Sequence, residues 1–280
     1  MVRSAAAKAY STLSSTPSTI PPEIRRTRVL ILGGTTESSA LAQRLVVLRD
    51  LDIISSLAGR TSNPVLPPGR TRIGGFGGPA GLTSFIRQNG IEVVIDATHP
   101  FASRMGWNAA QACKAAEIPL LRLERPAWRR EAGDQWTETE TLEQAATSLE
   151  GRAKRVLLAI GRQELMPFVR LKDIWFLIRS VEVPAARPLF AQAEFLLAKG
   201  PFALEHELTL LSEKSIDTIV CKNSGGNATY AKLMAARQLG IRVVIKQRPS
   251  RPKTETVPTV ADAAAWIKTF SERRRGLKAR

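Results

Sequence analysis

The residues best suited to chemistry lie at the end of an apolar run, in the segment Val93-Val-Ile-Asp-Ala-Thr-His-Pro-Phe-Ala102. The apolar half of this segment predicts a buried strand, and ligands of open α/β sheets bind beyond the carboxyl ends of such strands. Asp96, Thr98 and His99 are therefore candidate catalytic residues, and Pro100 holds the backbone of His99 extended. A histidine that only ties the loop together by hydrogen bonds explains the same pattern nearly as well.

A lysine-containing turn is the second candidate for chemistry. It follows the predicted strand Thr218–Cys221, and its lysine, polar side chains and glycine amides together suit an anion. An ordinary turn with a solvated lysine accounts for the segment about as well. The predicted substrate-binding residues are Lys222, Asn223, Ser224, Gly225 and Gly226, with Arg162 from an earlier glycine turn. Tyr230, just after this turn, is a further catalytic candidate.

The strongest local pattern for a nucleotide lies near the start of the chain. The predicted strand Arg28–Leu32 runs directly into the pair Gly33 and Gly34, and a predicted helix follows at once. In such a turn, backbone N–H groups and the N-terminus of the helix face a phosphate. The match to the G-x-G-x-x-G spacing is imperfect, because the later glycine positions hold Thr, Glu or Ser. A plain turn between strand and helix fits this segment about equally well.

The next predicted strand indicates which dinucleotide would bind. An NAD site usually places an acidic residue at the end of this strand, roughly 20 residues beyond the glycines. Here Asp52–Leu57 ends without a carboxylate, and Arg60 follows, which could donate to a 2′-phosphate or simply be a solvated surface arginine. A glycine-rich loop then adds backbone that can approach a ligand closely. The pattern favours NADP, and the predicted cofactor-binding residues are Gly33, Gly34, Thr35, Thr36, Glu37, Arg60, Gly74, Gly75, Phe76 and Gly77.

Composition narrows the class of protein. The 41 basic and 25 acidic residues give a net charge of +16, of which each chain end carries +4. The remaining excess suits nucleic acid, phosphates or a polycarboxylate. We find no nucleic-acid motif, no apolar run of the roughly 18 residues that a membrane helix needs, and no histidine or cysteine spacing typical of a metal site. We therefore expect a cytoplasmic protein that binds neither nucleic acid, membrane nor metal.

The alternation of strand-like and helix-like stretches predicts an α/β fold with two Rossmann-like domains, mainly parallel sheets and a cleft between them. We expect a disordered leader over residues 1–27, an NADP-binding domain over 28–125, a second domain for substrate over 138–270 and a solvated basic tail over 271–280. The predicted strands are Arg28–Leu32, Asp52–Leu57, Thr71–Ile73, Glu92–Asp96, Pro119–Leu123, Arg155–Ile160, Ile174–Ile178, Glu194–Leu197, Thr218–Cys221 and Arg242–Ile245.

Six segments in this order resemble the precorrin-6A reductases over about Arg28–Phe270. They are Gly33-Gly-Thr-x-Glu37, Ala58-Gly-Arg60, Gly74-Gly-Phe-Gly-Gly78, Asp96-Ala-Thr-His-Pro-Phe-Ala102, Ile160-Gly-Arg-Gln-Glu-Leu165 and Lys222-Asn-Ser-Gly-Gly226. The resemblance implies an oxidoreductase of corrin metabolism that uses NADPH to saturate one double bond of precorrin-6A, giving precorrin-6B in cobalamin biosynthesis. Hand-over contacts with neighbouring enzymes of the pathway are a further expectation.

Three alternatives stay open at this point. The related reaction on cobalt-precorrin-6A uses a similar protein, and a non-catalytic NADP-binding module would show the same first glycine turn. A nucleic-acid-binding protein would share the basic charge. The resemblance assigns the phosphates of the cofactor to Gly33, Gly34, Thr35 and Arg60. It places Asp96, Thr98, His99 and Lys222–Gly226 next to both the nicotinamide and the macrocycle.

Overall fold

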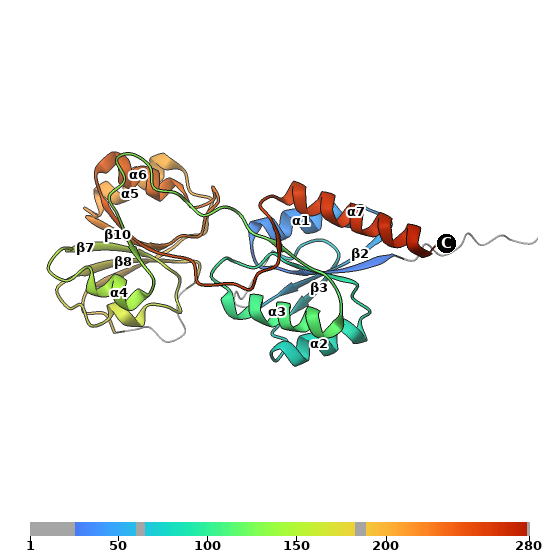
Figure 1. The fold of residues 1–280 in the computed structure, drawn as a ribbon. Helices are drawn as coiled ribbons and strands as arrows, with labels where there is room; N and C mark the ends of the chain where they lie inside the picture. The colour runs from blue at the N-terminus through green and yellow to red at the C-terminus, as the bar shows by residue number, and fades with distance from the viewer. Residues whose placement is uncertain (1–25, 60–64, 183–188, 279–280) are drawn as a thin grey trace, which may run out of the picture.

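The computed structural model describes residues 26–59, 65–182 and 189–278, which form two α/β domains joined by two chain segments (Figure 1). Each domain contains one parallel sheet of six strands. The predicted fold class is confirmed. Most of the predicted leader and the whole of Arg60 lie outside the described residues.

The first domain has the strand order of a dinucleotide-binding sheet. Its order is β3-β2-β1-β4-β5-β12, in which strands are added toward one edge up to β3 and toward the other edge from β4 onward, so the order reverses between β1 and β4. Helices α1 and α7 cover one face, and α2 and α3 cover the other (Figure 1). The elements are β1 Thr27–Leu32, α1 Thr36–Val46, β2 Leu51–Leu57, β3 Arg70–Ile73, α2 Pro79–Gln88, β4 Val93–Asp96, α3 Ser103–Ala116, β5 Leu120–Leu123, β12 Glu255–Val257 and α7 Val260–Lys278.

The second domain repeats this arrangement for five of its six strands. Its order is β9-β8-β7-β10-β11-β6, which reverses between β7 and β10, and its edge strand β6 comes before the other five in the chain. Helices α5 and α6 cover one face, and α4 with a short 3-10 turn covers the other (Figure 1). The elements are β6 Trp136–Thr139, α4 Leu142–Thr147, β7 Arg155–Ala159, the 3-10 turn Met166–Phe168, β8 Trp175–Ser180, β9 Ala193–Leu197, α5 Leu204–Glu213, β10 Thr218–Lys222, α6 Ala231–Leu239 and β11 Arg242–Lys246.

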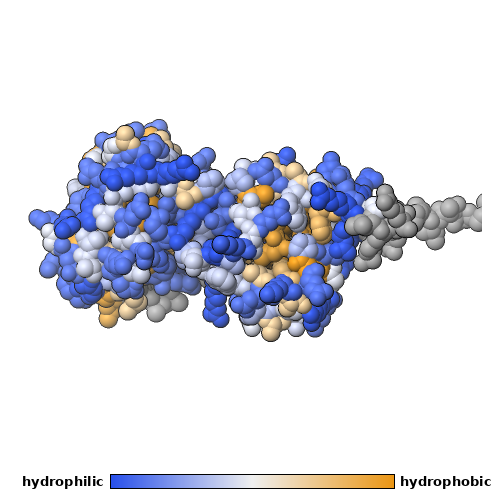
Figure 2. Space-filling model, viewed as in Figure 1, coloured by the Kyte–Doolittle hydropathy of each residue, from blue (hydrophilic) through white to orange (hydrophobic). Residues whose placement is uncertain are grey.

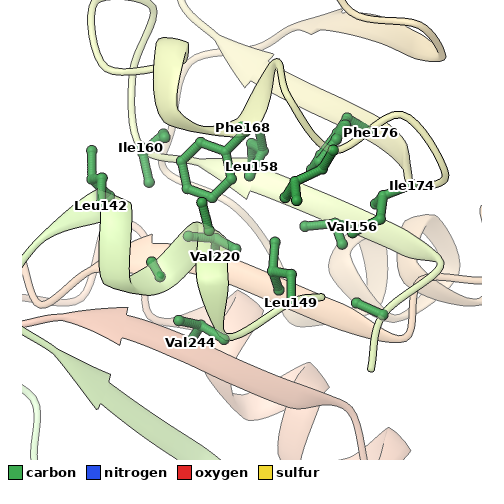
Figure 3. Close-up of a cluster of buried hydrophobic side chains, with 14 of the residues drawn as sticks. Leu142, Leu149, Val156, Leu158, Ile160, Phe168, Ile174, Phe176, Val220 and Val244 are labelled. Atoms are coloured by element: carbon green, nitrogen blue, oxygen red, sulfur yellow. The ribbon is translucent and has the colours of Figure 1, made fainter. Parts of the chain in front are cut away.

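The central strands are apolar on both faces because helices cover both sides of each sheet. Along β1, Val29 and Ile31 point into the core under α1 and α7, while Leu30 and Leu32 point into the core under α2 and α3. In the second domain, Phe168 and Phe176 fill the core under α4 with their rings in edge contact, as Figure 3 shows. These cores hold the loops at the strand ends in fixed positions.

All ten predicted strands are present, but the predicted domain boundaries need correction. β12 pairs with β5, and α7 packs against α1, so the chain returns to the first domain after residue 254. Residues 271–278 of the predicted basic tail are part of α7 rather than a solvated tail, and Arg274 and Arg275 form ion pairs with Glu92 and Asp50. β6 begins at Trp136, before the predicted start of the second domain at residue 138. Sequence periodicity missed β6 (Trp-Thr-Glu-Thr) and β12 (Glu-Thr-Val), polar edge strands that contain no apolar run.

The surface seen in Figure 2 is mostly hydrophilic, with hydrophobic residues gathered on the first domain between α7 and the layer of α2 and α3. Among the described residues, none of the helices is both long and apolar enough to cross a membrane.

The C-terminal helix gives a test of this corrected boundary. Ile267 is fully buried in the core of the first domain, so Ile267→Ala should lower the free energy of unfolding by about 3 kcal/mol. Lys268→Ala, at the exposed neighbouring position, should change it by less than about 0.5 kcal/mol. Urea unfolding measures both. Equal effects of the two substitutions would contradict the packing of α7 on the first sheet.

Candidate functional site

The carboxyl edges of the two sheets face each other. Lys222, at the end of β10, lies with its Nζ 5.3 Å from the centre of the Phe101 ring in the loop after β4. Arg125, just beyond β5, donates to the carbonyl oxygen of Ser224 (2.8 Å) and forms an ion pair with Glu37 on α1 (2.6 Å). The loops that sequence analysis singled out in both halves of the chain therefore meet between the domains.

The turn after β1 is organised by the N-cap of α1. Thr35 accepts from the N–H of Ser38 (3.1 Å) and donates its hydroxyl to the carbonyl oxygen of Ala97 (2.9 Å), which ties this turn to the loop after β4. The backbone N–H groups of Thr36 and Glu37 find no acceptor among the described residues. A helix N-terminus with unpaired N–H groups suits a phosphate, so this turn fits the predicted dinucleotide.

Glu37 has a different role from the one predicted. Its carboxylate pairs with Arg125 and lies close to Gly226, where an added Cβ would come within 3.5 Å of its Oε1. The side chain therefore contributes to the contact between the domains, and only the backbone of this residue faces the predicted phosphate position.

The glycine-rich loop after β3 is held by an arginine that sequence analysis did not assign. The Arg72 guanidinium lies 4.0 Å from the centre of the Phe76 ring and donates to the carbonyl oxygens of Gly74 (2.5 Å) and Gly75 (2.6 Å). No described atom lies within 4 Å of an added Cβ at Gly74, Gly75 or Gly77. The loop thus presents open backbone next to the end of β2, as a cofactor-binding loop requires.

Asp96 positions the loop after β4 rather than facing solvent. It is buried, with 1% of its surface exposed, and its Oδ1 accepts from the N–H (3.2 Å) and hydroxyl (2.6 Å) of Thr98. Its Oδ2 forms an ion pair with Arg251, which comes from the returning chain segment. Both oxygens of the predicted catalytic carboxylate are therefore used to fix the loop.

His99 is uncharged in this environment. Burial, together with the nearby cations Lys222, Arg125, Arg248 and Arg251, lowers the pKa of His99 from 6.5 to about 3. Its Nδ1 accepts from the N–H of Phe101 (3.2 Å). A neutral imidazole is a weak proton donor, so the geometry favours the loop-tying interpretation over general acid catalysis.

The Lys222–Gly226 turn binds the first of the two chain segments that join the domains, residues 124–135 between β5 and β6. Asn223 is buried, and its carboxamide accepts from the N–H (2.8 Å) and donates to the carbonyl oxygen (3.1 Å) of Trp128. This use of both ends of the amide explains why an Asn stands here. Its nitrogen also donates to Oε1 of Gln247 (3.4 Å), so both N–H groups are paired and only the carboxamide oxygen could make the predicted substrate contact.

The two glycines of this turn allow close approach of the same segment. Gly225 and Gly226 have φ values of +68° and +72°. An added Cβ would lie 2.0 Å from the carbonyl oxygen of Pro126 at Gly225, and 2.6 Å from the Cδ of Arg125 at Gly226. The glycine pair is thus required by packing between the domains, whether or not it also contacts a ligand.

A cavity of about 210 Å³ lies at the carboxyl ends of β7, β8 and β10. It contains two of the predicted substrate-binding cations: Arg162, which pairs with Glu182 (2.8 Å), and Lys222, which pairs with Glu164. The cavity is lined by Ile160, Gly161, Arg162, Gln163, Glu164, Ser180, Val181, Glu182 and Lys222.

The turn after β7 differs from its counterpart after β1 in one respect. It leads into a single 3-10 turn, whereas the turn after β1 leads into the 11-residue helix α1. A single 3-10 turn supplies no comparable array of N–H groups for a phosphate. The second domain therefore offers side-chain cations where the first offers backbone donors.

Tyr230 is not brought together with the other catalytic candidates. Its hydroxyl donates to Glu131 and accepts from Arg237 (3.1 Å), and its ring lies against Trp128. Glu131, Arg237 and Trp128 do not line the cavity. The side chain supports the first chain segment between the domains, a contact that a local sequence pattern does not reveal.

A family model described as precorrin-6x reductase CbiJ/CobK matches residues 28–268. A Rhodococcus erythropolis protein named precorrin-6A reductase is 47% identical over 88% of this chain and 100% of its own length. A Priestia megaterium protein named cobalt-precorrin-6A reductase is 27% identical over 79% of this chain and 90% of its own length. A solved structure titled CobK precorrin-6A reductase has a TM-score of 0.82 and 41% identity, covering 87% of this chain and 96% of that one.

The charge state of His99 can be tested through stability. Between about pH 7 and about pH 5 the unfolded chain protonates this residue at its ordinary pKa, while the folded chain does not, because its pKa is about 3. Stability therefore falls as pH falls, by up to about 2 kcal/mol from this residue. His99→Gln should lose less stability than the wild type over the same range. Urea unfolding at both pH values measures the difference, and identical losses would contradict a neutral His99.

The hydrogen bonds between Asn223 and Trp128 can be tested by substitution. Asn223→Ala leaves the N–H and carbonyl of Trp128 unpaired in a buried place, so the free energy of unfolding should fall by about 2 kcal/mol. Ser224→Ala is the matched control, since its hydroxyl makes one long bond, to the carbonyl oxygen of Lys222 (3.3 Å). If Asn223→Ala left stability unchanged but weakened substrate binding, the residue would belong to the ligand site after all.

Proposed function

The chain belongs to the precorrin-6x reductase family, and from this premise we propose that it reduces precorrin-6A to precorrin-6B with NADPH in cobalamin biosynthesis. The observation that supports this most directly is that the carboxyl edges of the two sheets face each other and carry different binding groups. One edge carries a dinucleotide-type turn, and the other carries a cavity with cationic side chains. A two-substrate reduction needs both ligands to meet, and this arrangement would bring them together.

NADPH would bind along the carboxyl edge of the first sheet. The free N–H groups of Thr36 and Glu37 would receive the phosphates, and Gly33, Gly34 and Thr35 would shape the turn beneath them. The open backbone at Gly74–Gly77 lies beside the end of β2, where the adenosine end of a dinucleotide binds in sheets of this order. When bound, the cofactor supplies the hydride.

The macrocycle would occupy the second domain. Precorrin-6A carries many acetate and propionate groups, and Arg162 and Lys222 are cations within a cavity that opens at the sheet edge. The basic excess of the chain is consistent with two polyanionic ligands. The non-catalytic alternative leaves this second cationic site without a purpose.

The residues of the chain would act mainly by positioning. Asp96 and Arg251 hold the loop after β4, and that loop holds His99 and Phe101 against the second domain. Holding two reactants in a water-poor space lowers the barrier by removing the entropic cost of their encounter. The neutral state of His99 makes Lys222 or a water molecule the better candidate for the proton that completes the reduction.

The comparisons bear on the choice between the two forms of the substrate. Five relatives named precorrin-6A reductase are 40–47% identical to this chain, whereas three named cobalt-precorrin-6A reductase are 25–27% identical. This difference supports the metal-free substrate. The predicted cytoplasmic location and the hand-over contacts with pathway enzymes stay predictions.

The experiment is anaerobic incubation of the purified chain with precorrin-6A and NADPH. Oxidation of the cofactor and the spectrum of the macrocycle are followed together. Equimolar loss of NADPH with a shifted chromophore is the expected result. Cofactor binding without either change would direct the same assay to cobalt-precorrin-6A, and failure to bind NADPH would overturn the assignment of the first domain.

Arg60 tests the preference for NADPH. On sequence grounds it follows the end of β2 and would pair with the 2′-phosphate, so Arg60→Ala should weaken NADPH binding about tenfold or more and leave NADH binding unchanged. Arg70→Ala is the control, because Arg70 is exposed and pairs with Asp52 (3.4 Å). Titration of cofactor fluorescence measures both dissociation constants. An equal loss for NADH would remove Arg60 from this role.

A further inference from the structure

Two lysines lie side by side at the carboxyl edge of the second sheet. Lys222 ends β10 and Lys246 ends β11, and the two residues are direct partners in the parallel register. Residues in register on neighbouring strands project their side chains to the same face of the sheet. Both side chains are largely buried, with 17% and 20% of their surfaces exposed. Lys246 was not among the predicted site residues.

The two ammonium groups share a single carboxylate. Glu164 forms an ion pair with Lys222 through Oε2, and its Oε1 lies 3.6 Å from the Nζ of Lys246. Within the part of the chain that the structure describes, these are the ion pairs that the two lysines make. The local charge of these three groups is therefore +1, in a partly desolvated place where like charges repel strongly.

Phe101, in the loop after β4 of the first domain, lies opposite the two lysines. The Phe101 ring centre lies 5.3 Å from the Nζ of Lys222 and 5.9 Å from the Nζ of Lys246. Phe101 is two residues beyond His99, in the loop that Asp96 fixes. A ligand group held by the two lysines would therefore lie next to the loop that borders the predicted nicotinamide position.

The Glu164 side chain lies where it can move away from the two lysines. It lies in the turn between β7 and the 3-10 turn, and 33% of its side chain is exposed, more than either lysine. It also lines the cavity. A carboxylate from a ligand could take its place on the lysines without moving any strand, while Glu164 turned into solvent.

We propose that Lys222 and Lys246 form a paired site for one acetate or propionate carboxylate of the macrocycle, and that Glu164 occupies this site until the substrate displaces it. The proposal rests on the proposed function, since it names the contact by which that substrate is held. It makes Lys246 a substrate-binding residue and Glu164 an internal competitor. Two ammonium groups around one carboxylate give charge-assisted hydrogen bonds to both of its oxygens.

The effect of Glu164→Gln on substrate affinity distinguishes a competitor from a residue that only supports the lysines, because the two roles predict changes of opposite sign. If Glu164 only stabilised the lysines, Glu164→Gln would weaken substrate binding. If it competes with the substrate, the same change removes the competitor and strengthens binding. The neutral amide keeps the size of the side chain, so the comparison isolates its charge.

The experiment measures KM and kcat for precorrin-6A under anaerobic conditions with saturating NADPH. Lys246→Gln should raise KM about tenfold, the loss of one charge-assisted contact, with kcat and NADPH affinity near those of the wild type. Lys246→Arg keeps the charge and should restore most of the affinity. Glu164→Gln should lower KM about threefold or more, and the KM of this variant should rise more steeply with salt.

The matched control is the ion pair between Lys214, directly after α5, and Glu194 on β9 (2.8 Å), neither of which lines the cavity. Lys214→Gln and Glu194→Gln should leave KM unchanged, and urea midpoints report whether each variant is folded. An unchanged KM in folded Lys246→Gln, or a raised KM in Glu164→Gln, would overturn the paired site while the reductase activity stands. A wild-type chain that does not reduce precorrin-6A would instead overturn the proposed function and the paired site together.

Discussion

The carbonyl oxygen of Ser224 accepts hydrogen bonds from two arginines, Arg125 at 2.8 Å and Arg248 at 3.1 Å. Arg125 belongs to the chain segment that leaves the first domain, and Arg248 to the segment that returns to it. The turn after β10 therefore contacts both chain segments that join the domains. Gly225 and Gly226 in that turn let the first segment approach to a distance that a side chain would forbid.

A second group of contacts extends this constraint to the reactive loop. Arg251, also on the returning segment, pairs with the buried Asp96 and donates to the carbonyl oxygens of His99 (3.2 Å) and Pro100 (3.3 Å). Gly106 on α3 leaves room for this guanidinium, since an added Cβ would lie 2.6 Å from its Nε. The same segment thus sets the distance between the domains and the shape of the loop between their ligands. Such rigid support is what a reaction that depends on positioning requires.

The two sheets share the order of five of their six strands, yet they perform different tasks because their first turns differ. In the first domain the chain enters a helix directly after β1 and leaves N–H donors at its start. In the second it enters a single 3-10 turn after β7, and charged side chains such as Arg162 and Glu164 occupy the edge instead. Backbone donors suit the phosphates of a cofactor, whereas lysine and arginine side chains suit carboxylates spread around a macrocycle. Topology alone does not decide which ligand a sheet edge binds.

The sequence by itself determined ten of the twelve strands, the two-domain α/β class and the loops that form the site. These features follow from apolar runs and glycine turns, which are local and leave a pattern in the chain. Tertiary structure alone decided that the segment after residue 254 returns to the first sheet, because β12 is a polar strand of three residues with no period to recognise. It also decided the roles of Asp96, Asn223 and Tyr230, whose polar side chains suit catalysis and structural hydrogen bonding equally in a sequence. Whether each side chain is catalytic or structural depends on its hydrogen-bond partner, which is Arg251 for Asp96, Trp128 for Asn223 and Glu131 for Tyr230. These partners are distant in the chain, and only folding brings them within hydrogen-bonding range.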